Sequence, residues 1–221
     1  MQRRLVGAAV AGLAWAAMAT VNGVDGKNSA SSLQPSELTP PLEDMKVRWD
    51  GKEASGSGMK TFDSPRFGMV RDGGARAHTG VDLDAPVGTP IFAVADGVIT
   101  LARYNDPMLG SDILLMFRPT ASMLTYLAST GSAANEGVLF ANYAHLSAVF
   151  VETGQQVVRG TMIGRTGTSG NAEQKYPHLH FEIRKTRFPG TGAASLRNRI
   201  DPEVMFKVDF STPVEAVTRP K

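Results

Sequence analysis

The sequence of 221 residues predicts a mainly β fold, a single domain with tight turns and few short helices. From Phe62 to about Phe206, short apolar runs alternate with turns rich in Gly, Pro, Asn and Asp. Runs of this length that are rich in β-branched and aromatic residues are typical of strands. Helical spacing of apolar residues is hard to find, and Ser122–Ala128 is the one plausible short helix.

Five segments are expected to form the strands, because each is bounded by turn residues. In chain order they are PIFAVADGVITLAR (90–103), DILLMFR (112–118), GVLFANYAHL (137–146), QQVVRGTMIGRTG (155–167) and HLHFEIR (178–184). The first and fourth repeat a pattern of glycine turn, apolar strand and glycine turn. This echo resembles the hammerhead domains that carry biotin or lipoate. The lysine that such carriers need at a hairpin tip is missing, so we interpret the echo as common β-turn sequence.

The N-terminus reads as an export signal of residues 1–19. Arg3 and Arg4 precede a short apolar run, and Ala17-Met18-Ala19 fits a small-x-small cleavage site. The alternative is a retained anchor helix, but the run is short and only weakly apolar for a bilayer span. We therefore expect an exported protein, periplasmic or secreted, with no membrane span after cleavage. The remaining boundaries are expected to be a linker at 20–59 with a short ordered piece around 45–49, the domain at 60–206 and a frayed tail at 207–221.

Composition narrows the function classes. The hydrophobic content of 42% and the charged content of 20% are ordinary for a soluble globular protein. The chain has no cysteine, which excludes disulfides, thiolate metal sites and a cysteine nucleophile. Without the two signal-peptide arginines, the 23 basic residues fall to 21 and equal the 21 acidic ones. No basic run with interleaved aromatics is present, so no nucleic-acid partner is expected.

The chain has four histidines, and three of them fall in the clusters HTGVD (78–82) and HLH (178–180). Side chains two apart on a strand share a face, so His178, His180 and Glu182 are expected to point away from the core. His78 and Asp82 are expected on a loop entering a strand, where both can reach one ion. Histidine and aspartate are normal zinc ligands, and three protein ligands leave a fourth position open, as in catalytic zinc sites. Both imidazoles of HLH can coordinate the ion, or one can coordinate it while its neighbour transfers protons.

Taken together, the motifs HTGVD, YAHL (143–146) and PHLHFEIR (177–184) resemble the lysostaphin-type (LytM domain) zinc metallopeptidases. These enzymes cut peptide bonds in bacterial peptidoglycan. The resemblance extends over roughly 64–206 and includes SPRFG, DAPVGTPIFAVADGVI and GTMIGRTGTSG. It implies an antiparallel fold similar to a duplicated hybrid motif, with the site in an open groove, and a peptidoglycan peptide as the partner of a monomeric protein.

The resemblance also implies a role for each site residue. His78, Asp82 and His180 correspond to the ligands of one zinc ion, and His145 and His178 correspond to the two catalytic histidines. The implied reaction is attack by zinc-activated water, with these two histidines as general base and oxyanion stabiliser. Apart from these five residues, Glu182 could orient a ligand imidazole or form a surface salt bridge. Arg76 could meet a substrate carboxylate or be a solvated loop residue.

Three rival functions are considered. A non-catalytic relative that activates a cell-wall amidase would share the fold but lose ligands, and none is lost here. A plain glycan- or wall-binding module would bind no metal. A serine or cysteine hydrolase is set aside because the chain has neither GxSxG nor cysteine.

Two insertions are expected to shape the groove and substrate choice. The longer is Arg118–Glu136, which leads into the strand of His145, and the shorter is NAEQKY (171–176), which precedes PHLH. Long loops on rigid β scaffolds often carry specificity. The alternative for the longer insertion is a surface excursion that points away from the site.

Overall fold

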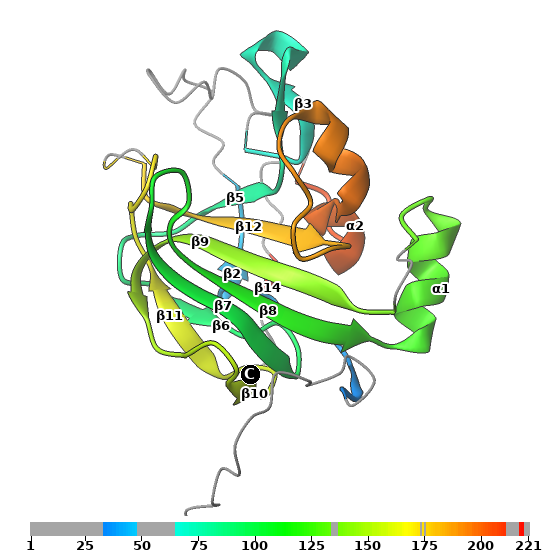
Figure 1. Ribbon diagram of the computed structural model, residues 1–221. Coiled ribbons are helices and arrows are strands. Elements are labelled where there is room, and N and C mark those ends of the chain that lie inside the picture. The colour runs from blue at the N-terminus through cyan, green and yellow to red at the C-terminus, as the bar shows by residue number, and fades with distance from the viewer. Residues whose placement is uncertain are drawn as a thin grey trace, which may run out of the picture.

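A computed structural model describes residues 33–47, 65–133, 137–172, 174, 176–210 and 217–218. Most described strands join one ten-stranded sheet (Figure 1). Its path runs β10-β7-β8-β9-β11-β6, and β12 joins β9 to β5 and β13. The bounds are β1 Pro35–Ser36, β5 Val81–Asp84, β6 Pro90–Phe92, β7 Gly97–Asp106, β8 Gly110–Pro119, β9 Leu139–Val149, β10 Gln156–Val157, β11 Met162–Thr166, β12 His178–Arg184 and β13 Arg199–Ile200.

The predicted mainly β, antiparallel fold is confirmed. Every pairing in the large sheet is antiparallel except that of the two-residue β1, which runs parallel to β8. Two small pairs complete the described strands: β2 (Asp44–Met45) with β14 (Val217–Thr218), and β3 (Gly68–Arg71) with β4 (Arg76–His78). The described helices are α1 (Ala121–Ser129), α2 (Pro202–Phe206) and two 3-10 turns at Asp72–Gly74 and Ala193–Asn198.

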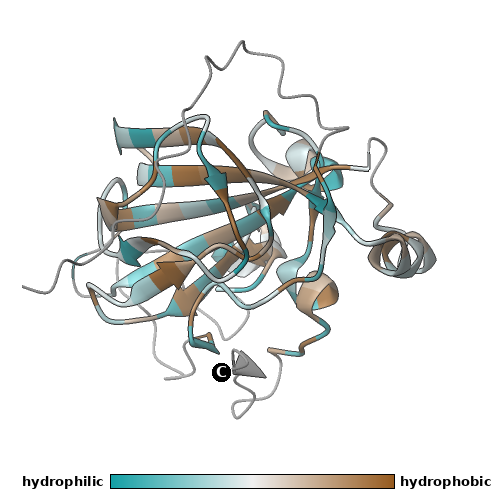
Figure 2. Ribbon diagram, turned by 90° about the horizontal axis from the view of Figure 1, so that it is seen from below, coloured by the Kyte–Doolittle hydropathy of each residue, from teal (hydrophilic) through white to brown (hydrophobic). Residues whose placement is uncertain are grey.

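The core lies against one face of the long strands. Residues of β12 alternate as predicted: Leu179, Phe181 and Ile183 are fully buried in the core, and the polar residues between them face the other side. The same alternation appears as brown and teal bands along the strands in Figure 2. This burial fixes the register of β12, because a shift of one residue would exchange its two faces.

The helix predicted at Ser122–Ala128 is confirmed as α1. Its N-terminus is capped by Thr120, whose hydroxyl accepts a hydrogen bond from the Met123 backbone N–H, and Leu127 is buried under it. In Figure 1, α1 stands beyond the ends of β8 and β9. The Lys207 ammonium lies 4.6 Å from the Tyr126 ring centroid, which ties the helix to the end of α2.

The boundaries of the packed unit differ from those expected. Residues 33–47, expected in a linker with a short ordered piece around 45–49, pack on the domain: Leu42, Met45 and Val47 are buried, and the Asp84 backbone N–H donates to the Lys46 carbonyl at 2.8 Å. In the expected tail, Phe210 is fully buried. The reason is local, since both segments carry apolar side chains that fill the core edge.

The expected signal at 1–19 lies outside the described residues. Among the described residues, no helix is long and apolar enough to cross a membrane.

Candidate metal centre and its cavity

The two histidine clusters meet where β5 and β12 pair. In the register of these strands, His180 lies directly opposite Asp82. Asp82 is a strand residue rather than a loop residue, and His78 is the last residue of β4. Gly80 permits this approach, because a Cβ at that position would lie 2.3 Å from the Phe181 carbonyl oxygen. The close contact holds the HTGVD turn against β12.

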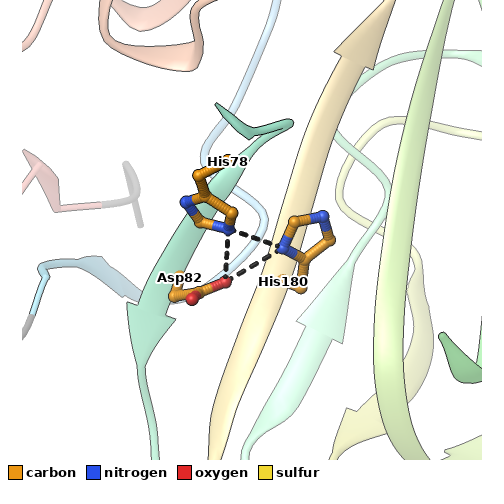
Figure 3. Close-up of side chains that lie close together, drawn as sticks. All are labelled: His78, Asp82 and His180. Carbon is orange, nitrogen blue, oxygen red and sulfur yellow. Dashed lines mark hydrogen bonds and ion pairs between the residues drawn. The ribbon is translucent and has the colours of Figure 1, made fainter. Parts of the chain in front are cut away.

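Three ligand atoms converge in this arrangement (Figure 3). Asp82 Oδ1 lies 3.1 Å from His78 Nε2 and 2.9 Å from His180 Nδ1, and the two ring nitrogens are 3.1 Å apart. All three side chains are buried. One nitrogen or oxygen from each residue lies within 4.8 Å of the others, so the three could hold a single metal ion.

The hydrogen bonds on the far side of each ring support this fit. His78 Nδ1 lies 2.8 Å from the Arg66 carbonyl oxygen, and His180 Nε2 lies 3.0 Å from Glu182 Oε1. Carbonyl and carboxylate oxygens only accept, so these ring nitrogens carry the protons. The facing nitrogens, His78 Nε2 and His180 Nδ1, then present lone pairs to each other and to a carboxylate. A cation between them satisfies all three acceptors.

The electrostatics suit a cation as well. Burial lowers the pKa of His78 to about 4, so its ring is neutral. Burial opposes ionisation of Asp82, but its electrostatic interactions with His78, His178 and Arg71 outweigh burial and hold the Asp82 pKa well below its usual range. For His180, burial is outweighed by hydrogen bonds to Asp82 and Glu182, which raise its pKa to about 9.

The other two histidines lie beside this centre. The His145 ring is 5.0 Å from the His178 ring and 5.8 Å from the His180 ring. His178 Nδ1 lies 2.8 Å from the Tyr176 carbonyl oxygen, and His145 Nδ1 lies 2.8 Å from the Ser169 carbonyl oxygen. Both Nδ1 atoms therefore donate, and Nε2 is left as the proton acceptor. His178 Nε2 is 3.6 Å from Asp82 Oδ1.

His145 reaches the site through an irregularity in β9. Alternation from the buried Tyr143 would send its side chain into the core, but its φ of 65° lies in the left-handed region. The register shifts here against both β8 and β11, as expected at a β-bulge. The His145 backbone N–H donates to the Leu109 carbonyl at 2.8 Å, which holds this conformation. Burial, with the charges of His180 and His178, lowers the His145 pKa to about 3.

Glu182 is buried and contacts a ligand, which resolves the alternative of a surface salt bridge. Its Oε1 accepts from His180 Nε2 at 3.0 Å and from the Thr79 hydroxyl at 2.7 Å. Its Oε2 accepts from Arg184 Nε at 2.5 Å and Arg199 Nε at 3.1 Å. Burial opposes its charge, but His180 and the two arginines lower the Glu182 pKa well below its usual range.

Sequence reasoning missed several of these supporting residues. Arg184 continues the two-residue alternation of His178, His180 and Glu182, which could have indicated it. Arg71 donates from its Nη2 to Asp82 Oδ2, and no sequence spacing signals this contact. Thr79 lies within HTGVD, but the motif assigns it no role, and Arg199 lies outside the three motifs.

The centre opens into a cavity of about 790 Å³. Arg76 lines it, but its guanidinium is half exposed and pairs with Asp72 Oδ2 at 2.7 Å. Asn171, Ala172 and Tyr176 of the shorter insertion also line it, as predicted.

The prediction for Arg118–Glu136 is wrong for its described part, because none of residues 118–133 lines the cavity. The physical reason is the length of β8, whose far end carries the segment away with α1.

A protein-family profile and several known proteins match this chain. The profile of Peptidase family M23 matches residues 76–195. Peptidoglycan DD-endopeptidase ShyA of Vibrio cholerae is 33% identical over 106 residues, which are 48% of this chain and 20% of ShyA. DD-carboxypeptidase/endopeptidase Mpg of Neisseria meningitidis is 37% identical over 109 residues, 49% of this chain and 20% of Mpg. The chain therefore spans about a fifth of the length of these relatives.

Among solved structures, the catalytic domain of the antimicrobial peptidase lysostaphin from Staphylococcus simulans is 30% identical to this chain. The likeness covers 62% of this chain and 82% of that domain, with a TM-score of 0.45.

Proposed function

The chain belongs to Peptidase family M23, and from this premise we propose that it is a zinc-dependent endopeptidase that hydrolyses peptide bonds of bacterial peptidoglycan. The observation that carries the proposal is the convergence of His78, Asp82 and His180 on one point, with two more histidines beside it in the same cavity. Stem-peptide crosslinks are the favoured substrate, by analogy with the DD-endopeptidase ShyA and the DD-carboxypeptidase/endopeptidase Mpg.

Three residues would hold the ion, which we propose to be one zinc per chain. The donor set of two imidazoles and one carboxylate suits zinc and leaves a position open. Zinc bound there would supply Lewis acidity, polarising a peptide carbonyl and lowering the pKa of a coordinated water. Glu182 fixes the orientation of His180, and the Arg66 carbonyl fixes that of His78.

The remaining chemistry falls to His145 and His178. In each ring Nδ1 donates to a backbone carbonyl, so Nε2 is the atom that can take a proton from water. Once protonated, Nε2 becomes a donor. It can then deliver the proton to the leaving amine or hydrogen-bond the developing oxyanion. We propose that the two histidines share these tasks, since their rings lie 5.0 Å apart at the same wall of the cavity.

The alternative, a non-catalytic activator of a cell-wall amidase, makes a different prediction. An endopeptidase acting alone on purified sacculi should convert crosslinked peptide dimers into monomers, detected by mass spectrometry. An activator should yield no product alone and should release peptides from sugar only when an amidase is added. Dimers that persist after treatment with zinc-loaded protein would contradict the proposal.

We also propose that the protein is exported, because residues 1–19 have the pattern of a cleavable signal. Cleavage is expected after Ala19, so that N-terminal sequencing of the exported protein should begin at Thr20. A protein that keeps residues 1–19 in the membrane would indicate an anchor instead.

A further inference from the structure

The cavity extends beyond the metal centre along β12. His178, His180, Glu182 and Arg184 share one face of this strand, and all four line the cavity. At its far end the cavity is bounded by the segment 187–192, which follows β12. The Glu182 carboxylate links Arg184 to His180, because its Oε1 accepts from His180 Nε2 and its Oε2 accepts from Arg184 Nε.

Two buried arginines meet at that carboxylate, but they use their nitrogens differently. Arg199 uses all three: Nε donates to Glu182, Nη1 to the carbonyl and hydroxyl of Ser195, and Nη2 to the Gly190 carbonyl. Arg184 donates only from Nε, to Glu182 Oε2. No described residue accepts a hydrogen bond from its Nη1 or Nη2.

The two terminal nitrogens of Arg184 therefore face the cavity. Within the described part of the chain, the one buried side-chain nitrogen or oxygen atom without a partner is Asn142 Oδ1. The Nη atoms of Arg184 must then be reached by solvent, although the residue is only 8% exposed. A guanidinium held by Nε, with its two terminal nitrogens presented together, matches the geometry of a carboxylate.

The charge balance at this end of the cavity favours an anion. Arg184 and Arg199 share the single carboxylate of Glu182, so the buried cluster carries one positive charge in excess. Arg187 also lines the cavity there, and its Nη2 donates to the neutral Thr100 carbonyl. The other acidic residues that line the cavity are paired elsewhere, Asp82 with Arg71 and Asp106 with Arg103. An incoming carboxylate would neutralise the excess charge.

We propose that Arg184 is a specificity residue that binds a carboxylate of the substrate peptide through Nη1 and Nη2. This inference rests on the proposed function, because it assumes a peptide lying along the cavity with its scissile bond at the metal centre. The carboxylate is either the C-terminal one or one on a side chain of the peptide. Both sources offer the same planar, charged acceptor.

The test uses a synthetic stem-peptide dimer joined through a D-alanyl amide bond, in three forms. One form has all carboxylates free, one has the C-terminal carboxylate amidated, and one has the side-chain carboxylates amidated. Binding is measured by calorimetry on the zinc-loaded full chain, with analogues whose scissile amide is N-methylated so that they are not cleaved. Hydrolysis of the unmethylated forms is measured in parallel.

The expected result is that one of the two amidations weakens binding by about tenfold to hundredfold, the range for a hydrogen bond to a charged group. Arg184→Gln should bind the free and amidated forms equally, and Arg184→Lys should keep part of the preference. The control Arg197→Gln removes an exposed arginine that does not line the cavity, and it should behave as wild type.

Two results would overturn the proposal: wild-type protein that binds all three forms equally, or folded, zinc-loaded Arg184→Gln that keeps the preference. If that variant loses its fold or its zinc, the comparison of peptide forms on wild type and Arg184→Lys decides. A carboxylate preference in binding without any hydrolysis would refute the proposed endopeptidase and leave the carboxylate site standing.

Discussion

Glu182→Gln is the substitution whose consequences the structure specifies most fully. The Glu182 carboxylate accepts four hydrogen bonds, two on each oxygen, from His180, Thr79, Arg184 and Arg199. Glutamine offers one acceptor oxygen and one amide that donates. In either orientation of the amide, two donors lose their acceptor, and the two guanidiniums lose their counter-charge.

The magnitude follows from these losses. Removing one partner of a buried ion pair costs about 3–5 kcal/mol, because the remaining charge stays buried. For a chain of this size each kcal/mol lowers Tm by about 2–4 °C, so a fall of about 6–20 °C is expected. Loss of the group that orients a ligand imidazole weakens metal binding by about tenfold to hundredfold.

The assay combines thermal unfolding with zinc competition against a chromophoric chelator. Glu152→Gln, which removes an exposed carboxylate, is the matched control and should change neither quantity. A Glu182→Gln protein with wild-type zinc affinity would refute the reasoning, even if its Tm falls, since the carboxylate would then support the fold without orienting His180.

Three further predictions address other parts of the site and fold. His145→Ala and His178→Ala should each keep bound zinc and lose about two or more orders of magnitude in hydrolysis rate; loss of zinc by metal analysis would reassign the residue as a ligand. Gly80→Ala should lower zinc content, because the added Cβ would lie 2.3 Å from the Phe181 carbonyl and push β5 from β12; full zinc occupancy would show that the strands tolerate it. Asp201→Asn tests the pH dependence of stability. Burial and the nearby Glu203 charge raise the pKa of Asp201 to about 6. Protonated Asp201 therefore stabilises the folded state below about pH 4, and this contribution is lost as pH rises through 6. The free energy of unfolding of the variant minus that of wild type should therefore be larger at pH 8 than at pH 4, by at most about 3 kcal/mol. An equal difference at both pH values, measured by urea unfolding, would contradict this.

The local patterns of the sequence were sufficient for the strand that carries most of the site. Two-residue alternation in HLHFEIR correctly separated the polar face of His178, His180 and Glu182 from the buried Leu179 and its neighbours. The same rule fails at His145, which alternation would bury. A left-handed residue at a bulge depends on how β9 packs against β8 and β11, and no local propensity encodes it.

Side-chain contacts between residues far apart in the chain could not be predicted from the sequence either. Arg199 reaches Glu182 from β13, which pairs with β12, and Arg71 reaches Asp82 from β3, which pairs with β4 rather than with β5. The polar composition of residues 33–47 suggested a linker, yet a few apolar side chains such as Leu42 and Met45 are enough to seat the segment on the core. Arg118–Glu136 precedes the strand of His145 in the sequence, which suggested a place beside the site. That strand is long, however, and the segment leads into its far end, away from His145.

The most direct test of the central claim is hydrolysis of one crosslinked stem-peptide dimer by the purified zinc-loaded chain in H₂¹⁸O, followed by mass spectrometry. We predict two monomers, one of which carries a single ¹⁸O in its new carboxylate. We also predict that a chelator abolishes the reaction and that zinc restores it. An intact dimer in the presence of protein that holds one zinc at His78, Asp82 and His180 would contradict the account.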